Sequence, residues 1–222
     1  MCRGVSLASP QSVVESRFGV RARTPLAPRY NIAPGDRLDI IPESSPDELT
    51  RATWGFIPGW MTDLSTWPSP AICRAESAAT NPAFRPALAE NRCLVLADGF
   101  YVWEESPRNS QPYRVERIDS EPFAMAGLYQ PTTTNGIAKL TAAIMTTEAN
   151  AMVGRIDRRM PVLLEPGEEA RWLDNADRSM LDPYPAGLLE SYPVSTAVND
   201  ITNDYAALVE PIEIGRRSLL NE

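Results

Sequence analysis

The sequence predicts an α+β fold built around a curved, largely antiparallel β-sheet. Short runs rich in β-branched, aromatic or aliphatic residues outnumber the helical patterns and do not alternate regularly with them. The 21 prolines are spread along all 222 residues and divide the chain into short elements. A chain of this length can fill one core, so we expect a single domain over residues 1–222.

Each element is predicted from its local pattern. A short capped helix is expected after Ser9-Pro10, with Gly19 as its stop. Two more helices are expected at Pro82–Glu90 and Gly167–Leu173, the second opening with the acidic residues that a first turn prefers. The tail from about residue 180 is interrupted by prolines, and we expect it to wrap the surface. Strands are expected at Leu38–Ile41, Arg51–Ile57, Cys93–Leu96, Gly99–Trp103, Tyr113–Glu116, Pro122–Tyr129 and Ala142–Thr147.

Composition excludes several classes of protein. The hydrophobic share of 43% and charged share of 23% are those of a globular chain, and apolar stretches such as Phe123–Tyr129 fall short of the roughly 20 residues of a spanning helix. The first residues lack the apolar core of a secretory signal, so we expect a cytoplasmic protein with no membrane partner. Cys2, Cys73 and Cys93 do not suggest a disulfide framework. The chain has no histidine, so we expect no metal, no cofactor and no histidine-activated nucleophile.

The net charge of −8 argues at first against a nucleic-acid partner, because affinity for DNA rests largely on neutralised phosphates. However, Lys139 is the only lysine among the 21 basic residues, and the arginines that make up the rest are the better phosphate ligands. An acidic, lysine-poor surface is also typical of a protein that stays soluble in high salt. Whether the protein can bind DNA therefore depends on where the arginines lie rather than on the total charge.

Cys2 is the first candidate for chemistry. Removal of Met1 would leave it as the N-terminal residue, with an α-amine of ordinary pKa about 7.7–8.0 and a thiol of pKa about 8.5. An aldehyde can form an imine with the amine, and the thiol can then close a five-membered thiazolidine. The alternative is a cysteine that stands at position 2 without a role.

Five segments combine arginines with aromatic residues, as sites for single-stranded nucleic acid do. Taken singly, each can be structural: Trp54 and Trp60 could be core residues, and Asn31 could cap a turn. The segments are Arg29–Pro34, Trp54–Trp60, Arg74–Glu76, Ala97–Trp103 and Arg158–Pro161.

Nearly the whole chain resembles the SOS-response-associated peptidase (SRAP) family of abasic-site processing proteins. The resemblance rests on many short segments in the family's order. They are Met1-Cys2, Arg29–Pro34, Trp54–Trp60, Arg74–Glu76, Phe84-Arg85, Arg92–Leu94, Asp98–Trp103, Phe123–Leu128, Met145–Thr147, Ala149-Asn150, Arg159–Val162 and Tyr192–Ser195.

This resemblance implies a domain with an open, barrel-like sheet, short flanking helices and a basic groove for single-stranded DNA that contains abasic sites. It implies that Cys2, freed of Met1, forms a thiazolidine with the ring-opened abasic sugar and so a DNA–protein crosslink. We expect the protein to act as a monomer. The DNA-binding residues that the resemblance implies are Arg3, Asn31, Pro34, Trp54, Trp60, Arg74, Trp103, Thr147 and Arg159.

The chain departs from the family pattern at positions that the resemblance implies take part in the reaction. Arg3 and Gly4 exchange the order of the family's Gly-Arg, and Ile72, Val102 and Asp157 replace its asparagine, glutamate and histidine. A positioned acid or base typically supplies about 10²–10⁴-fold in rate, and valine cannot transfer a proton. Asp157 is one candidate surrogate. Glu104 is another, because it shares a strand face with Val102. Both could equally be solvated surface carboxylates.

Three hypotheses follow. The first is an enzyme-like protein that still crosslinks abasic sites through Cys2. The second is a non-catalytic paralogue that binds single-stranded or damaged DNA without a covalent bond. The third is an interaction module that keeps the fold but has lost the DNA site, so that Arg74 and Arg159 no longer line one basic groove.

Overall fold

A computed structural model describes residues 3–61, 67–104, 110–134, 137–175 and 177–214. The strands are β1 Val5–Leu7, β2 Arg21–Ala22, β3 Arg29–Ile32, β4 Arg37–Pro42, β5 Glu48–Trp54, β6 Ile72–Arg74, β7 Arg92–Ala97, β8 Gly99–Glu104, β9 Gln111–Arg117, β10 Phe123–Thr134, β11 Ile137–Glu148, β12 Arg159–Pro161, β13 Leu163–Leu164 and β14 Leu189–Pro193. The α-helices are α1 Gln11–Phe18, α2 Ala75–Ala78, α3 Arg85–Glu90 and α4 Glu169–Asp174. Short 3₁₀ turns are η1 Val153–Arg155, η2 Arg178–Leu181, η3 Ala186–Leu188, η4 Thr196–Asn199 and η5 Ala206–Val209.

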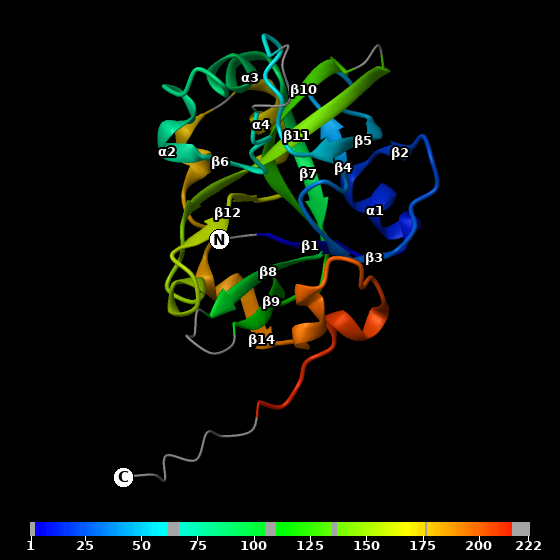
Figure 1. Cartoon of the computed structure of the whole chain (residues 1–222), viewed down its shortest axis with the longest axis vertical. Helices are drawn as coiled ribbons and strands as arrows, with labels where there is room; N and C mark the ends of the chain where they lie inside the picture. The colour runs from blue at the N-terminus through cyan, green and yellow to red at the C-terminus, as the bar shows by residue number, and fades with distance from the viewer. Residues whose placement is uncertain (1–2, 62–66, 105–109, 135–136, 176, 215–222) are drawn as a thin grey trace.

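The larger sheet is nine-stranded and mostly antiparallel, with its path running β12-β11-β10-β7-β4-β5-β2 (Figure 1). Strand β11 also pairs in parallel with β5, through Thr141 with Thr53 and Ala142 with Trp54. This pairing joins the two ends of the run β11-β10-β7-β4-β5, so the strands form a ring. The predicted α+β class is confirmed. The barrel, however, is closed by the short parallel pairing rather than left open.

The smaller sheet is five-stranded, in the order β14-β9-β8-β1-β3. The chain passes from the larger sheet to the smaller one at Asp98, the single residue between β7 and β8. Strand β1 is the fourth strand and pairs antiparallel with both β8 and β3. The segment that follows Cys2 is therefore held on both sides within a sheet.

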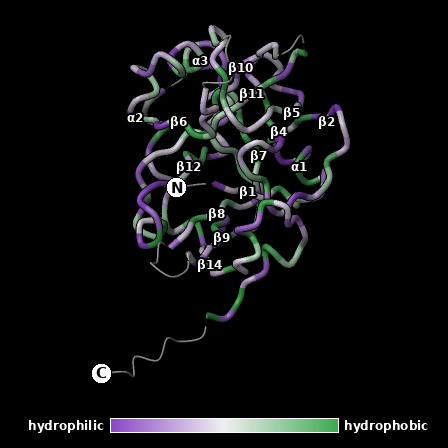
Figure 2. Tube along the Cα trace, viewed as in Figure 1, coloured by the Kyte–Doolittle hydropathy of each residue, from purple (hydrophilic) through white to green (hydrophobic). Residues whose placement is uncertain are grey.

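The main core fills the ring and the space between the two sheets. Its largest members include Trp54, Trp172, Phe56, Phe100 and Phe123. Figure 2 shows hydrophobic stretches along the central strands and hydrophilic ones mainly in the peripheral segments. No helix in the described part of the chain is long and apolar enough to cross a membrane.

The structure corrects several boundaries predicted from the sequence. The predicted capping role of Ser9 is wrong: α1 begins after Pro10 without a side-chain cap, and the Ser9 hydroxyl donates instead to Asp98. Gly19 does end the helix, in the left-handed conformation with φ 66°. The predicted strand Arg51–Ile57 is displaced toward the N-terminus as Glu48–Trp54. The tail does more than wrap the surface, since β14 pairs with β9 at the sheet edge.

Candidate functional site

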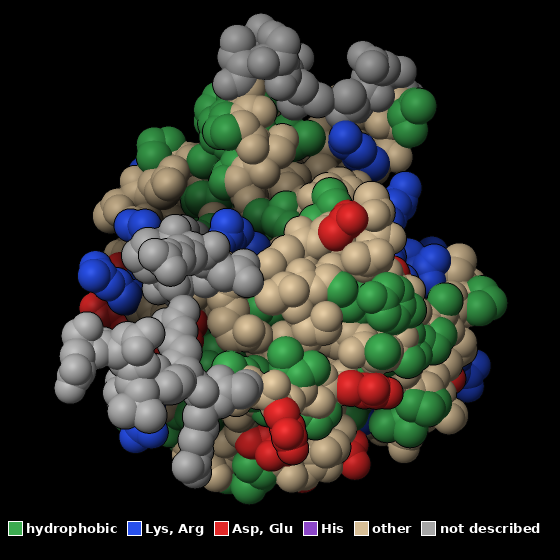
Figure 3. All heavy atoms as spheres, turned by 60° about the horizontal axis from the view of Figure 1, so that its bottom comes forward, with side chains coloured by type: hydrophobic (Ala, Val, Ile, Leu, Met, Phe, Trp, Pro, Cys, Tyr) green, Lys and Arg blue, Asp and Glu red, His purple; other side chains and the backbone are tan. Residues whose placement is uncertain are grey.

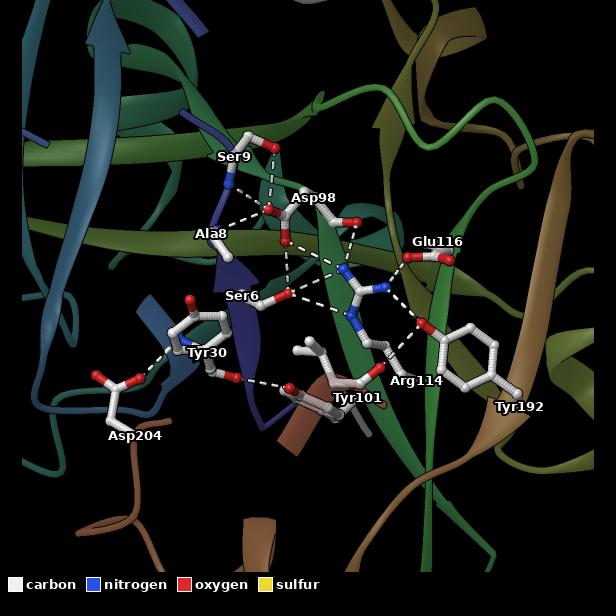
Figure 4. A network of polar contacts seen from close by, with 11 residues as sticks. Ser6, Ala8, Ser9, Tyr30, Asp98, Tyr101, Arg114, Glu116, Tyr192 and Asp204 are labelled. Atoms are coloured by element: carbon white, nitrogen blue, oxygen red, sulfur yellow. Dashed lines mark hydrogen bonds and ion pairs between the residues drawn. The ribbon is translucent and has the colours of Figure 1, made fainter. Parts of the chain in front are cut away.

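The carboxylate of Asp98 anchors the N-terminal strand. Oδ1 accepts a hydrogen bond from the Ser6 hydroxyl at 2.7 Å, and Oδ2 accepts from the backbone amides of Ala8 and Ser9 at 2.6 and 2.8 Å (Figure 4). These contacts join the end of β7 to β1 and to the turn that precedes α1. Hydrogen bonds to an ionised acceptor are the stronger kind, so this one residue fixes the path of the chain just after Cys2.

Arg114 on β9 is hydrogen-bonded to Asp98. Its Nη2 donates to Asp98 Oδ1 at 3.1 Å and to the Asp98 carbonyl at 3.0 Å. Its Nη1 donates to the Tyr192 hydroxyl at 2.8 Å and pairs with Glu116 (Figure 4). A Cβ at Gly99 would lie 2.5 Å from Arg114 Nε, so only glycine leaves room for this guanidinium.

Sequence reasoning missed the Asp98 and Arg114 network. The available signal was an Asp-Gly pair between two apolar runs, which marks a change of direction in the chain. No sequence pattern indicated a buried role for Arg114, because a lone arginine in a predicted strand usually faces solvent.

A pocket of about 400 Å³ lies beside β1, on the side of β8 that carries Trp103. The guanidinium of Arg3 lies over the Trp103 ring, 5.3 Å from its centroid. The Trp103 indole N–H donates to Asn199 Oδ1 at 2.7 Å. Asn31 and Pro34 also line the pocket, so the structure brings together four of the predicted DNA-binding residues.

Asn31 shapes this pocket rather than offering a donor to it. The side chain is buried, and its amide nitrogen donates to the backbone carbonyls of Val198, Asp200 and Asn203 at 3.1, 3.2 and 3.0 Å. These bonds hold the C-terminal segment against β3.

A second cluster lies where β6 and β12 flank β11. Thr146 pairs with Arg74 on one side, and Glu148 pairs with Arg159 on the other. The guanidinium of Arg159 forms a bidentate ion pair with Glu76, at 3.0 and 2.9 Å. Arg74 is exposed and forms no ion pair with any described residue. Arg74 and Arg159 therefore share one region of the surface, where the guanidinium of Arg159 is paired with Glu76.

Glu76 decides the electrostatics of this cluster. The hydrogen bonds from Arg159, with a weaker contribution from Arg74, lower the pKa of the Glu76 carboxyl. A neighbouring pocket of about 220 Å³ is lined by Glu76, Thr147 and Asp182 among others. The predicted groove residue Thr147 therefore lies beside two carboxylates.

The two candidate surrogate acids differ in their surroundings. Asp157 lies at the turn before β12, half-buried, and its Oδ1 accepts the backbone N–H of Arg159 at 3.2 Å. Glu104 lies on the same strand face as the fully buried Val102, but at the exposed end of β8. There the Tyr113 hydroxyl donates to it at 3.5 Å. The structure thus places only Asp157 beside a predicted phosphate-binding arginine.

The three tryptophans predicted to contact DNA lie in different environments. Trp54 is only 1% exposed, and its indole N–H donates to the Ala71 carbonyl at 2.7 Å, so its predicted role as a DNA-contacting aromatic is wrong. Trp60 is 57% exposed and packs edge-on against Trp67 at 6.0 Å between ring centroids. A ring so exposed is available for base stacking. Trp103 lines the pocket described above.

Cys2 lies outside the described residues. The other two cysteines are buried, and burial raises the pKa of the Cys73 thiol to about 12 and that of Cys93 well above its ordinary value. Neither thiol is therefore a thiolate nucleophile at neutral pH. Among the residues that the structure describes, no group of three or more Cys, Asp or Glu side chains could hold a metal ion.

Residues 1–201 match the family model described as SOS response associated peptidase (SRAP). The abasic site processing protein YoqW of Bacillus subtilis is 35% identical over 95% of this chain and 99% of its own. YedK of Escherichia coli is 28% identical over 83% of this chain and 85% of its own. A crystal structure of a protein from Bacteroides thetaiotaomicron aligns with a TM-score of 0.85 at 26% identity, covering 96% of this chain and 100% of that one. The chain belongs to the SRAP family.

Proposed function

We propose that this protein processes abasic sites in single-stranded DNA, and that it does so through a covalent crosslink to Cys2. The proposal is supported chiefly by the family match over residues 1–201, with relatives named abasic site processing proteins along nearly their whole length. The structure adds that the strand following Cys2 is fixed at Asp98 beside a pocket that contains Arg3 and Trp103.

The reaction needs the free α-amine of Cys2, so Met1 must first be removed by hydrolysis of its peptide bond. The amine nitrogen attacks the aldehyde carbon of the ring-opened sugar, and the resulting carbinolamine loses one water to give an imine. The sulfur then adds to the imine carbon, and the thiol proton is transferred to the nitrogen. The product is a thiazolidine, with one water released in total.

Proton transfer in these steps is assigned to Asp157. Val102 and Ile72 occupy the family's glutamate and asparagine positions and carry no ionisable or hydrogen-bonding group. Asp157 stands at the histidine position, two residues before Arg159, and its carboxylate accepts the backbone N–H of Arg159. Because aminothiols condense with aldehydes unaided, the loss of the other groups slows the reaction without abolishing it.

The test is intact-mass measurement after mixing the protein with a short single strand that contains one abasic site. The expected product has the mass of the Met1-free protein plus the DNA minus one water. Cys2→Ala should form no adduct, whereas Cys73→Ala, which removes a buried thiol, should still form it. An adduct that persists in Cys2→Ala would refute the proposal.

A second candidate function is binding of single-stranded or damaged DNA without a covalent product. It is favoured by the buried, apolar Val102, which cannot transfer a proton at the family's glutamate position. A Met1-free protein that binds the abasic strand in a salt-dependent way and gives no adduct would support this candidate over the first.

A further inference from the structure

A long groove lies where the β10–β11 hairpin comes together with β4 and β5, in the upper right of Figure 1. It is open to solvent and has a volume of about 890 Å³. Its walls come from strand residues and from Gly59 and Met61, which flank the exposed Trp60. None of the residues that line it belongs to the pocket of Trp103 or to the Glu76 cluster.

The strand register places three cations on one face of the sheet. Arg37 pairs with Thr53 across β4 and β5, and Thr53 pairs with Thr141 across β5 and β11. Because alternate residues of a strand share a face, Arg51 lies on the face of Thr53 and Lys139 on that of Thr141. Strands β5 and β11 run parallel, so Arg51 and Lys139 are displaced in the same direction and line the same groove.

The groove is basic although the chain carries a net charge of −8. Arg37, Arg51 and Lys139 line it, and no described lining residue is acidic. Arg51 pairs with the nearby Asp39, which is buried, at 3.1 Å. Arg37 and Lys139 form no ion pair with any residue in the described ranges. Figure 3 shows Lys and Arg side chains in two areas of the face drawn, at its upper right and at its left, and Asp and Glu mostly in its lower half.

We propose that this groove is a second phosphate-binding surface, which takes the sugar–phosphate backbone of DNA beyond the stretch held at the lesion site. The unpaired charges of Arg37 and Lys139 would each neutralise a phosphate, and the Thr132 and Thr133 side chains add hydroxyl donors. Trp60 at the rim offers a stacking surface for a base, so cations and an aromatic ring are combined as in sites for single strands. The assignment rests on the proposed function for the identity of its ligand.

The experiment measures binding of fluorescein-labelled, undamaged single-stranded DNA, in a short and a long form, as a function of salt. For the long strand, Arg37→Ala/Lys139→Ala is expected to reduce the slope of log affinity against log salt by about 1.4, which is two phosphates at about 0.7 each. The slope for the short strand should not change. Arg171→Ala, which removes an exposed arginine on α4, should match the wild type with both strands.

Lys139→Arg keeps the charge and should keep the wild-type slope, which separates loss of charge from damage to the hairpin. A double variant with the wild-type slope on the long strand would overturn the assignment. So would binding of anionic phospholipid vesicles that requires Arg37 and Lys139 while DNA binding does not. Since the DNA is undamaged, the result is independent of Cys2 chemistry: absence of the abasic adduct refutes the proposed crosslink and leaves the groove measurement valid.

Discussion

Replacing Asp98 by alanine tests whether one buried carboxylate holds the N-terminal strand in place. The substitution removes the acceptor for Ser6, for the amides of Ala8 and Ser9, and for Arg114, whose side chain is 7% exposed. Breaking a buried ion pair costs about 3–5 kcal/mol, because the remaining charge is left uncompensated. Arg114 keeps Glu116 as a partner, which places the expected loss toward the lower end, at about 3 kcal/mol.

The free energy of unfolding is to be measured in urea for the wild type, Asp98→Ala and Asp98→Asn. Asparagine keeps one acceptor oxygen and should lose less than alanine. Asp119→Ala is the matched control, because it breaks the more exposed pair with Arg117 and should cost only about 0–1 kcal/mol. At a temperature where Asp98→Ala stays folded, its yield of Cys2 adduct should fall. A loss of less than about 1 kcal/mol in Asp98→Ala would refute the reasoning.

Four further predictions concern single side chains. Glu76→Gln frees Arg159 and should make binding of single-stranded DNA tighter and its salt slope steeper by about 0.7, with little loss of stability because Glu76 is 49% exposed. Trp60→Ala should weaken binding by about 1–3 kcal/mol without destabilising the fold. Trp54→Ala should instead lower the unfolding free energy by about 3–5 kcal/mol in a urea titration. Burial raises the pKa of Glu43, whose Oε2 is buried without a hydrogen-bond partner. The folded state therefore binds the Glu43 proton more tightly, and stability falls as pH rises from the unfolded pKa through the folded one. Glu43→Gln should gain stability at neutral pH and none in acid.

The sequence predicted the long elements well because their patterns are strong. Strands β7 and β8 were found nearly in full, as was the end of α1 at Gly19, whereas the two longest strands were found only in their apolar parts, as Pro122–Tyr129 for β10 and Ala142–Thr147 for β11. Strands of two or three residues, such as β1 and β6, carry too few side chains to show a period, and their pairing is decided by distant partners. The local motifs did not separate buried from exposed site candidates. Burial separates Trp54 from Trp60, and burial depends on the closed barrel rather than on the local motif.

The contacts of Asn31 couple the two ends of the described chain. Its amide nitrogen binds carbonyls between residues 198 and 203, while Asp204 accepts the backbone amides of Tyr30 and Asn31 at 2.6 and 3.2 Å. Strand β3 is in turn a hydrogen-bonding neighbour of β1. These segments should therefore open as one cooperative unit, with their amides exchanging hydrogen for deuterium at a common rate. A protease cut near residue 200 would therefore loosen β3 and β1 before it disturbed the barrel.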